Sequence, residues 1–233
     1  MDVRWAMAAA TALALTVIQP MTAQQPRKRE TTAVRQARIE ATIRNEYTHK
    51  FEIGGGGGYL RFRSGEYLQK NNEVSWQAAG TYYRSPSLGL NFDVRGSFGD
   101  AKTQNNIFNE AYNPLINQYY FLVGPNWRFY RKEKWSASVY GEGGASMGNF
   151  DGAAKGLVSE DLGLWQSATR PAFSAGLNLD YNIYPELFFR MSPTYVGTVF
   201  QLAADDPRPQ PHGGIQNNAG FNVGIYYRFG KQK

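Results

Sequence analysis

The feature that most constrains this chain is a regular alternation of apolar and polar side chains, which begins after residue 50 and recurs in eight runs. The clearest run, "LGLNFDVRGSFG", separates two sets of residues: Leu88, Leu90, Phe92, Val94 and Phe98 against Gly89, Asn91, Asp93, Arg95 and Ser97. A period of two residues is typical of a β-strand with one face against an apolar environment. The pattern alone leaves open whether that environment is a protein core or a lipid bilayer.

The connections between the runs favour the bilayer. The eight runs cover residues 51–63, 74–84, 88–99, 119–130, 135–147, 171–182, 187–200 and 221–229. The short connections "SPS", "RKEK" and "YPE" alternate with long ones, namely Ser64–Glu73, Asp100–Pro114, Gly148–Arg170 and Gln201–Asn217. A meander with tight turns at one end and long loops at the other has this order, and a sandwich with Greek-key crossings has no reason to keep it. We therefore predict an all-β fold over residues 49–233, an eight-stranded antiparallel up-and-down transmembrane β-barrel.

The polar faces of the runs carry six charged residues in or near mid-strand: Asp93, Arg95, Glu142, Asp180, Arg190 and Arg228. An eight-stranded barrel has an interior only wide enough for side chains or one small ligand, and unpaired charges there are costly. Because the acids and the arginines balance, we predict that these residues form a polar network inside the barrel. Such a filled interior argues against a sizeable channel.

The first 48 residues predict export followed by a spacer. Arg4 precedes the apolar run Trp5–Ile18, which is short for a membrane span and typical of a secretory signal peptide, placed here at residues 1–23. Residues 24–48 are basic and rich in helix-forming side chains, so we predict a helix-permissive periplasmic segment. It is either a solvated spacer or a basic helix that touches anionic lipid or a partner.

The composition argues against several other classes of protein. The chain has no cysteine and two histidines, His49 and His212, which leaves no basis for disulfides, thiolate metal sites or a multi-histidine centre. Much of the net charge of +6 lies in residues 24–50, whereas a nucleic-acid binder carries its basic excess on the folded domain. The glycines Gly54–Gly58 lead into a strand instead of the helix that a phosphate loop requires. We predict no cofactor, no bound metal and no nucleic-acid partner.

The signal sequence, the first strand "FEIGGGGGYLRF", the eight runs and the last strand "GFNVGIYYRF" together resemble the OmpA/OmpX-like superfamily of eight-stranded outer-membrane barrels. The resemblance covers about residues 51–229. It implies an outer-membrane location, periplasmic termini and contact with outer-membrane lipid and lipopolysaccharide. It also implies that Tyr227 and Phe229 belong to a C-terminal signal for the barrel-assembly machinery, although "GKQK" follows the last aromatic residue here.

From these observations we predict a monomeric, non-enzymatic barrel of Gram-negative type, with a structural or cell-surface interaction role carried by four long extracellular loops. Two alternatives stay open. Lipid A-modifying deacylases and acyltransferases resemble this chain in size, but they need a serine, a histidine and a carboxylate, and neither His49 nor His212 belongs to such a set in a strand. A soluble periplasmic β-sandwich that binds a ligand would show the same alternation.

Overall fold

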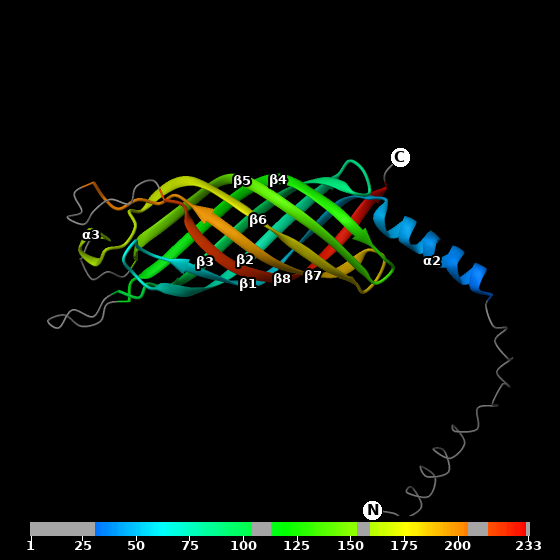
Figure 1. The fold of residues 1–233 in the computed structure, drawn as a ribbon, viewed down its shortest axis with the longest axis horizontal. Helices are drawn as coiled ribbons and strands as arrows, with labels where there is room; N and C mark the ends of the chain where they lie inside the picture. Colours follow the sequence, from blue (N-terminus) through cyan, green and yellow to red (C-terminus); the bar gives the residue numbers. More distant parts are fainter. Residues whose placement is uncertain (1–30, 104–112, 153–158, 205–213, 232–233) are drawn as a thin grey trace, which may run out of the picture. The chain divides into compact units, whose positions relative to one another are not determined.

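The structure is a computed structural model that describes residues 31–103, 113–152, 159–204 and 214–231. Eight antiparallel strands form a closed barrel in which each strand pairs with its neighbours in sequence and the last pairs with the first (Figure 1). The strands are β1 (His49–Arg63), β2 (Lys70–Tyr83), β3 (Leu88–Asp100), β4 (Leu115–Arg131), β5 (Trp135–Gly152), β6 (Ala168–Asn182), β7 (Leu187–Thr198) and β8 (Gln216–Lys231). The predicted eight-stranded barrel is confirmed, and the alternative of two stacked sheets is excluded.

The barrel has two different ends. Three short connections, residues 84–87, 132–134 and 183–186, lie at the end where β1 begins and β8 stops, which we call the turn end. The strand ends that flank the longer connections, at Asp100, Gly152 and Thr198, lie at the opposite end together with residues 64–69, and we call this the loop end. Short and long connections thus alternate along the chain as predicted.

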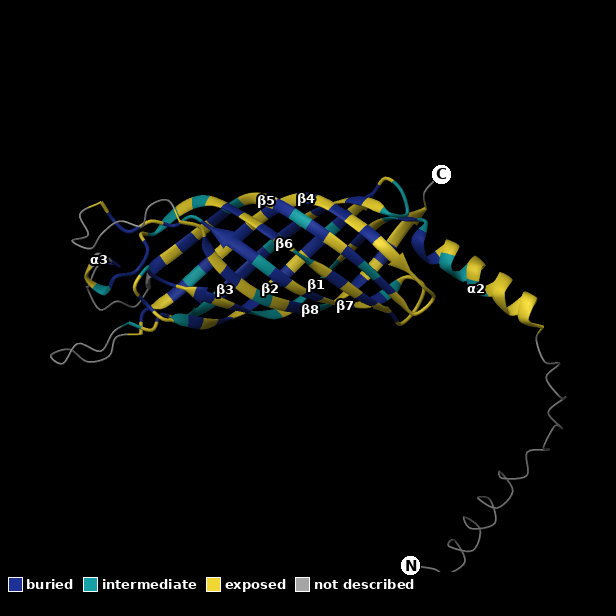
Figure 2. Cartoon of the chain, in the orientation of Figure 1, coloured by how far each residue is buried: buried dark blue, intermediate teal, exposed yellow. Residues whose placement is uncertain are grey.

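The alternation of side chains matches the two faces of the barrel wall (Figure 2). Apolar residues point outward and are exposed, for example Phe92, Phe121, Leu177 and Ile225. Polar residues of the same strands point inward and are buried, for example Gln77, Asp93, Asn178 and Asn222. Burial of polar groups and exposure of apolar ones is the reverse of a soluble protein, and it suits a wall surrounded by hydrocarbon.

Several strands extend beyond the predicted boundaries. β2 begins at Lys70, so the first long connection is residues 64–69 and not Ser64–Glu73. β5 ends at Gly152 and β6 begins at Ala168, so both strands reach into the predicted loop Gly148–Arg170. The start of β2 shows no apolar alternation, because Asn71 and Glu73 face the lumen and the outward-facing Asn72 between them is also polar. Backbone pairing therefore continues past the point where the apolar pattern stops.

The barrel closes along a seam between β1 and β8, in which Gly56 faces Gly224. A Cβ atom on Gly56 would lie 1.8 Å from the carbonyl oxygen of Val223, and one on Gly224 would lie 2.4 Å from the carbonyl oxygen of Gly55. No larger side chain fits at these positions without moving a backbone, so the glycines of the first strand serve a close approach of two strands.

Within the described ranges two helices accompany the strands, α2 (Thr32–Tyr47) and the short α3 (Ser159–Leu162). The chain divides into two units at residue 38, so only the part of α2 from Ile39 onward belongs to the same unit as the barrel. Neither described helix is long and apolar enough to cross a membrane. The predicted signal peptide at residues 1–23 lies outside the described residues, whereas the helix predicted within residues 24–48 is present from Thr32.

Candidate functional site

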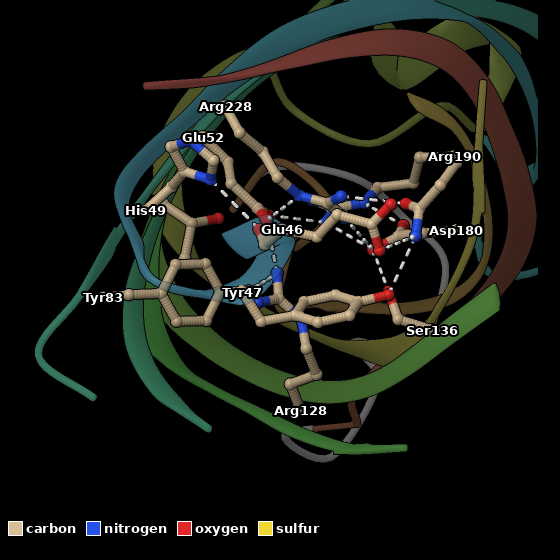
Figure 3. A network of polar contacts seen from close by, with 12 residues as sticks. Glu46, Tyr47, His49, Glu52, Tyr83, Arg128, Ser136, Asp180, Arg190 and Arg228 are labelled. Atoms are coloured by element: carbon tan, nitrogen blue, oxygen red, sulfur yellow. Dashed lines mark hydrogen bonds and ion pairs between the residues drawn. The ribbon is translucent and has the colours of Figure 1, made fainter. Parts of the chain in front are cut away.

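The largest group of charges lies inside the lumen near the turn end, and we call it the turn-end ionic cluster. It consists of two carboxylates and three guanidinium groups from five strands, namely Glu52, Arg128, Asp180, Arg190 and Arg228 (Figure 3). Each of the five side chains is almost completely buried. Because β1, β4, β6, β7 and β8 each supply one member, the cluster ties together strands on different sides of the barrel.

Glu52 is the hub of this cluster, because it accepts hydrogen bonds from all three arginines. Nη2 of Arg128 and Nε of Arg228 both donate to Oε1, the latter at 2.9 Å, and Nη2 of Arg190 donates to Oε2 at 2.9 Å. A buried carboxylate with three charge-assisted bonds is held firmly in its ionised form by its surroundings. Loss of Glu52 would leave three buried cations with one carboxylate between them.

Asp180 is the second carboxylate of the turn-end ionic cluster. Arg190 holds it in a bidentate contact, with Nε 2.7 Å from Oδ1 and Nη2 3.1 Å from Oδ2. The hydroxyl of Ser136 donates to Oδ2 at 3.1 Å, and Nη2 of Arg228 lies 3.9 Å from the same oxygen. The planar fork of an arginine suits this geometry, which a lysine does not reproduce.

The three arginines and two carboxylates of the cluster leave a net charge of +1, and aromatic rings stabilise the arginines. The Cζ atom of Arg128 lies 4.2 Å from the ring centre of Tyr83, and the Cζ atom of Arg228 lies 3.9 Å from that of Phe188. The Cζ atom of Arg190 lies 4.5 Å from the ring centre of Tyr226. Cation–π contacts of this kind strengthen when they are removed from water.

The last residues of α2 close the turn end of the lumen below this cluster. The hydroxyl of Tyr47 donates to the carbonyl oxygen of Lys132 at 2.8 Å and accepts from Nδ2 of Asn182 at 2.9 Å. The ring centre of Tyr47 lies 5.1 Å from the Cζ atoms of both Arg128 and Arg228. Burial raises the pKa of Tyr47 above its ordinary value, so its hydroxyl stays a donor.

Glu46 lies beside Tyr47 and is also buried. Nδ2 of Asn182 is 3.4 Å from its Oε2, and Nδ1 of His49 is 3.0 Å from its carbonyl oxygen. Burial raises the pKa of Glu46 to about 7, against the opposing field of Arg228. This carboxyl group therefore titrates near neutral pH at the point where α2 meets the barrel.

The middle of the lumen holds a second, smaller polar group. Nη2 of Arg95 is 2.7 Å from Oδ2 of Asp93, which also accepts a bond from Gln77. Glu142 accepts a bond from Asn91, and no ion pair to it is present among the described residues. These contacts connect β2, β3 and β5 at mid-height.

At the loop end the lumen is filled by apolar side chains, which we call the loop-end apolar cluster. Its largest fully buried members include Phe62, Phe150, Leu164, Trp165 and Phe200. The rings of Phe150 and Phe200 meet edge to face with centres 5.0 Å apart, and Trp165 donates from Nε1 to the carbonyl oxygen of Arg63 at 2.7 Å. Directly inside the cluster, Glu73 accepts bonds from Asn71 at 3.1 Å and from Gln118 at 3.0 Å.

The structure brings the six predicted lumen residues into two places. Asp180, Arg190 and Arg228 meet at the turn end, and Asp93 and Arg95 pair at mid-height, near Glu142. Sequence reasoning missed Glu52 and Arg128 as members of the set, although the fourth run placed Arg128 on the polar face. The missed signal for Glu52 is its position between outward-facing Phe51 and Ile53, which the following glycines obscure.

The remaining predicted residues lie elsewhere. Tyr227 and Phe229 face outward on β8 near the turn end, where Phe229 stacks on Phe51 with ring centres 5.4 Å apart. His49 is the first residue of β1 and lies at the turn end, and His212 falls outside the described residues. Among the described residues no three His, Cys, Asp or Glu side chains come together as metal ligands.

A closed eight-stranded barrel with an apolar outer wall and a polar, filled lumen defines the class of transmembrane β-barrels. The sequence of the chain matches the family model described as the outer membrane protein beta-barrel domain over residues 10–229. The chain therefore belongs to this family, and it is an integral protein of the outer membrane. The predicted family and location are confirmed.

Two solved structures with TM-scores above 0.5 show the same fold, and a third is similar to the chain. The outer membrane protein OprG from Pseudomonas aeruginosa is 13% identical, with a TM-score of 0.54 over 79% of this chain and 99% of that one. Neisserial surface protein A is 9% identical, with a TM-score of 0.51 over 77% of this chain and 97% of that one. The attachment invasion locus protein Ail of Yersinia pestis, in complex with a heparin analogue, is 16% identical, covers 78% and 99%, and has a TM-score of 0.47. No curated protein matches the sequence.

Proposed function

We propose that this barrel is a non-conducting, non-enzymatic scaffold that displays its long loops at the cell surface for structural or adhesive contacts. The observation that carries the proposal is that packed side chains close the lumen at both ends, by the turn-end ionic cluster with Tyr47 and by the loop-end apolar cluster. A filled lumen supports neither diffusion of solutes nor entry of a substrate. Function then belongs to the loops, which a rigid wall holds in place.

The proposed orientation places the turn end in the periplasm and the loop end outside the cell. Short turns on the periplasmic side and longer loops on the other are the rule for outer-membrane barrels. In this orientation the loops adjoin lipopolysaccharide, and the outward aromatic residues Tyr227 and Phe229 are available to the barrel-assembly machinery before insertion. Pairing of all eight strands within one chain supports a monomer, because no sheet edge is left for a second copy.

An enzymatic role gains no support from the described part of the chain. The family and the barrels of similar fold are mostly non-enzymatic. His49 is buried at the turn end against the carbonyl oxygen of Glu46, away from the outward face that a lipid A-modifying enzyme would use. Unchanged lipid A profiles in cells carrying the double variant His49→Ala, His212→Ala agree with the proposal, and a changed profile contradicts it.

The absence of cysteine allows a direct test of orientation. Lys102 at the loop end and Lys132 at the turn end are both exposed, and each is replaced by cysteine in a separate variant. A membrane-impermeant maleimide applied to intact cells should label Lys102→Cys and spare Lys132→Cys until the outer membrane is opened. The reverse pattern would overturn the orientation.

The closed lumen is tested by single-channel recording. The purified protein in planar bilayers should give no conductance steps, and a porin recorded in parallel gives the positive control. Regular steps from the wild-type protein would refute the sealed scaffold. In cells, loss of surface adhesion on shortening residues 199–215, with the amount of folded barrel unchanged, would support a role for the loops.

A further inference from the structure

A groove at the turn end is built from the last two turns of α2 and the neighbouring rim of the barrel. It has a volume of about 370 Å³ and is lined by Glu40, Ile43, Arg44, Tyr47, Thr48, Pro86 and Arg131. All of these residues belong to the unit that contains the barrel. Neither the polar lumen nor the loops use this groove, so it needs its own explanation.

Three charged side chains line the groove with their ends free. Arg44, Arg131 and Glu40 are exposed, and none of them makes a side-chain hydrogen bond or ion pair with another described residue. Arg44 and Glu40 are one helical turn apart on α2 and still do not pair within 4.0 Å. Two free guanidinium groups and one free carboxylate around the same hollow are suited to a ligand that carries one anionic and one cationic group.

The rest of the lining is apolar or only weakly polar. Ile43 and Pro86 are half-buried, and the ring of Tyr47 closes the inner side of the groove. A ligand that combines ionic ends with an apolar part therefore fits better than a sugar or a free inorganic ion.

The position of the groove indicates what the ligand is. Arg131 ends β4, four residues after Trp127, which is exposed on the outer wall opposite Leu88. Outward aromatic residues such as Trp127 and Phe129 mark the border between hydrocarbon and headgroups. At about 3.3 Å per residue the arginine lies roughly 13 Å further along the tilted strand, at the height of the headgroup layer.

We propose that this groove binds the headgroup of a membrane phospholipid that carries a phosphate and a primary ammonium, as phosphatidylethanolamine does. Arg44 and Arg131 take the phosphate, Glu40 takes the ammonium, and Ile43 and Pro86 contact the glycerol and the first acyl carbons. Bound lipid thereby attaches the last turns of α2 to the inner leaflet at the rim of the barrel. The choice of leaflet rests on the proposed orientation, whereas lipid binding itself is independent of the proposed role of the loops at the other end.

Native mass spectrometry of the full chain in micelles tests the proposal, with equal amounts of phosphatidylethanolamine and phosphatidylcholine added. The wild-type protein should retain phosphatidylethanolamine at least about fivefold more, since the trimethylated group of choline donates no hydrogen bond to Glu40. Arg44→Gln combined with Arg131→Gln should lose retention of both lipids. Glu40→Gln should abolish the preference and keep binding of the phosphate, including that of phosphatidylglycerol.

Arg61→Gln, an exposed arginine on β1 near the loop end, is the matched control and should retain lipid as the wild type does. Because the changed residues are at the surface, each variant should still form a closed barrel, and an unheated gel checks this. Equal retention by the wild type and the double arginine variant overturns the site. Equal retention of the two lipids by the wild type overturns the assignment of Glu40. Displacement of the lipid by a soluble anionic glycan or peptide overturns the assignment of a lipid as the ligand.

Discussion

At the turn end the lumen is closed by charge, and at the loop end it is closed by apolar side chains. The turn-end ionic cluster depends on the pairing of opposite charges, since Glu52 alone receives bonds from three arginines. The loop-end apolar cluster depends on shape, since Phe62, Phe150 and Phe200 fill space without directional bonds. A charged closure therefore fails abruptly when one member is lost, whereas an apolar closure weakens in proportion to the volume removed.

The largest effect is expected for Glu52→Gln. The substitution leaves three buried arginines with Asp180 as the remaining carboxylate of the cluster, and we expect a loss of about 3–5 kcal/mol in the free energy of unfolding. Urea titration in micelles, followed by gel mobility without heating, measures this loss. Adding Arg128→Gln removes one of the stranded charges and should recover part of the stability. If the double variant loses as much unfolding free energy as the two single variants added together, the hub role of Glu52 is wrong.

The next largest effect is expected for Phe62→Ala in the loop-end apolar cluster. Phe62 is fully buried and contacts Phe150 and Phe200, so we expect a loss of about 3 kcal/mol from the cavity and the lost contacts. The same urea titration measures this loss, with Phe62→Leu as the variant that removes less volume. The loss for Phe62→Leu should be clearly smaller, and an equal loss for both variants would show that this closure does not depend on the volume filled.

A smaller effect is expected from pH at the contact between α2 and the barrel. The pKa of Glu46 is raised to about 7 from an ordinary 4.5, so the docked state holds the proton more firmly than the undocked state. Docking is then strongest at low pH and weakens as the pH rises through this window, with Arg228 and Lys134 opposing the shift and Glu133 adding to it.

Hydrogen exchange of residues 43–48 measures this change. Corrected for the intrinsic rate, opening should increase roughly 70-fold between pH values of about 5 and 8, and Glu46→Gln should remove most of the dependence. An undiminished dependence in Glu46→Gln would assign the titration to a different group.

The smallest effect is expected for Glu73→Gln, the counterpart of Glu52→Gln at the opposite end. The carboxylate of Glu73 accepts bonds from the amides of Asn71 and Gln118 and forms no ion pair with a described residue. An amide of the same shape leaves no stranded charge, so the free energy of unfolding should change by less than about 1 kcal/mol. A loss as large as that of Glu52→Gln would mean that buried carboxylates, and not their cationic partners, decide stability in this lumen.

The sequence was sufficient to predict the wall of the barrel. Alternation in the third and eighth runs placed Phe92 and Ile225 outward and Asp93 and Arg228 inward, as the structure has them. This works because the period of a strand translates directly into two faces. The alternation also predicted most of the charged lumen residues, because the polar face of every strand in a closed barrel points into the lumen.

What the sequence could not provide are the partners inside the lumen. Glu52 precedes five glycines, which carry no side chain to define a face, and it was therefore not recognised as the hub. Leu60 and Tyr120 occupy the polar-face positions of their runs and are buried in the loop-end apolar cluster. Contacts across the barrel depend on the shear of the strands, which no local pattern contains. For the same reason the docking of Tyr47 was not predicted.

The seam between β1 and β8 determines when the chain can complete its fold. Gly56 meets Gly224 across this seam, so the earliest strand remains without one of its two partners until the latest strand has been synthesised and exported. Closure is thus a post-translational step with a high sequence separation between the joined strands, which makes it slow. Until that step the open edge of β1 must be shielded from other chains, and this is a task for a chaperone in the periplasm.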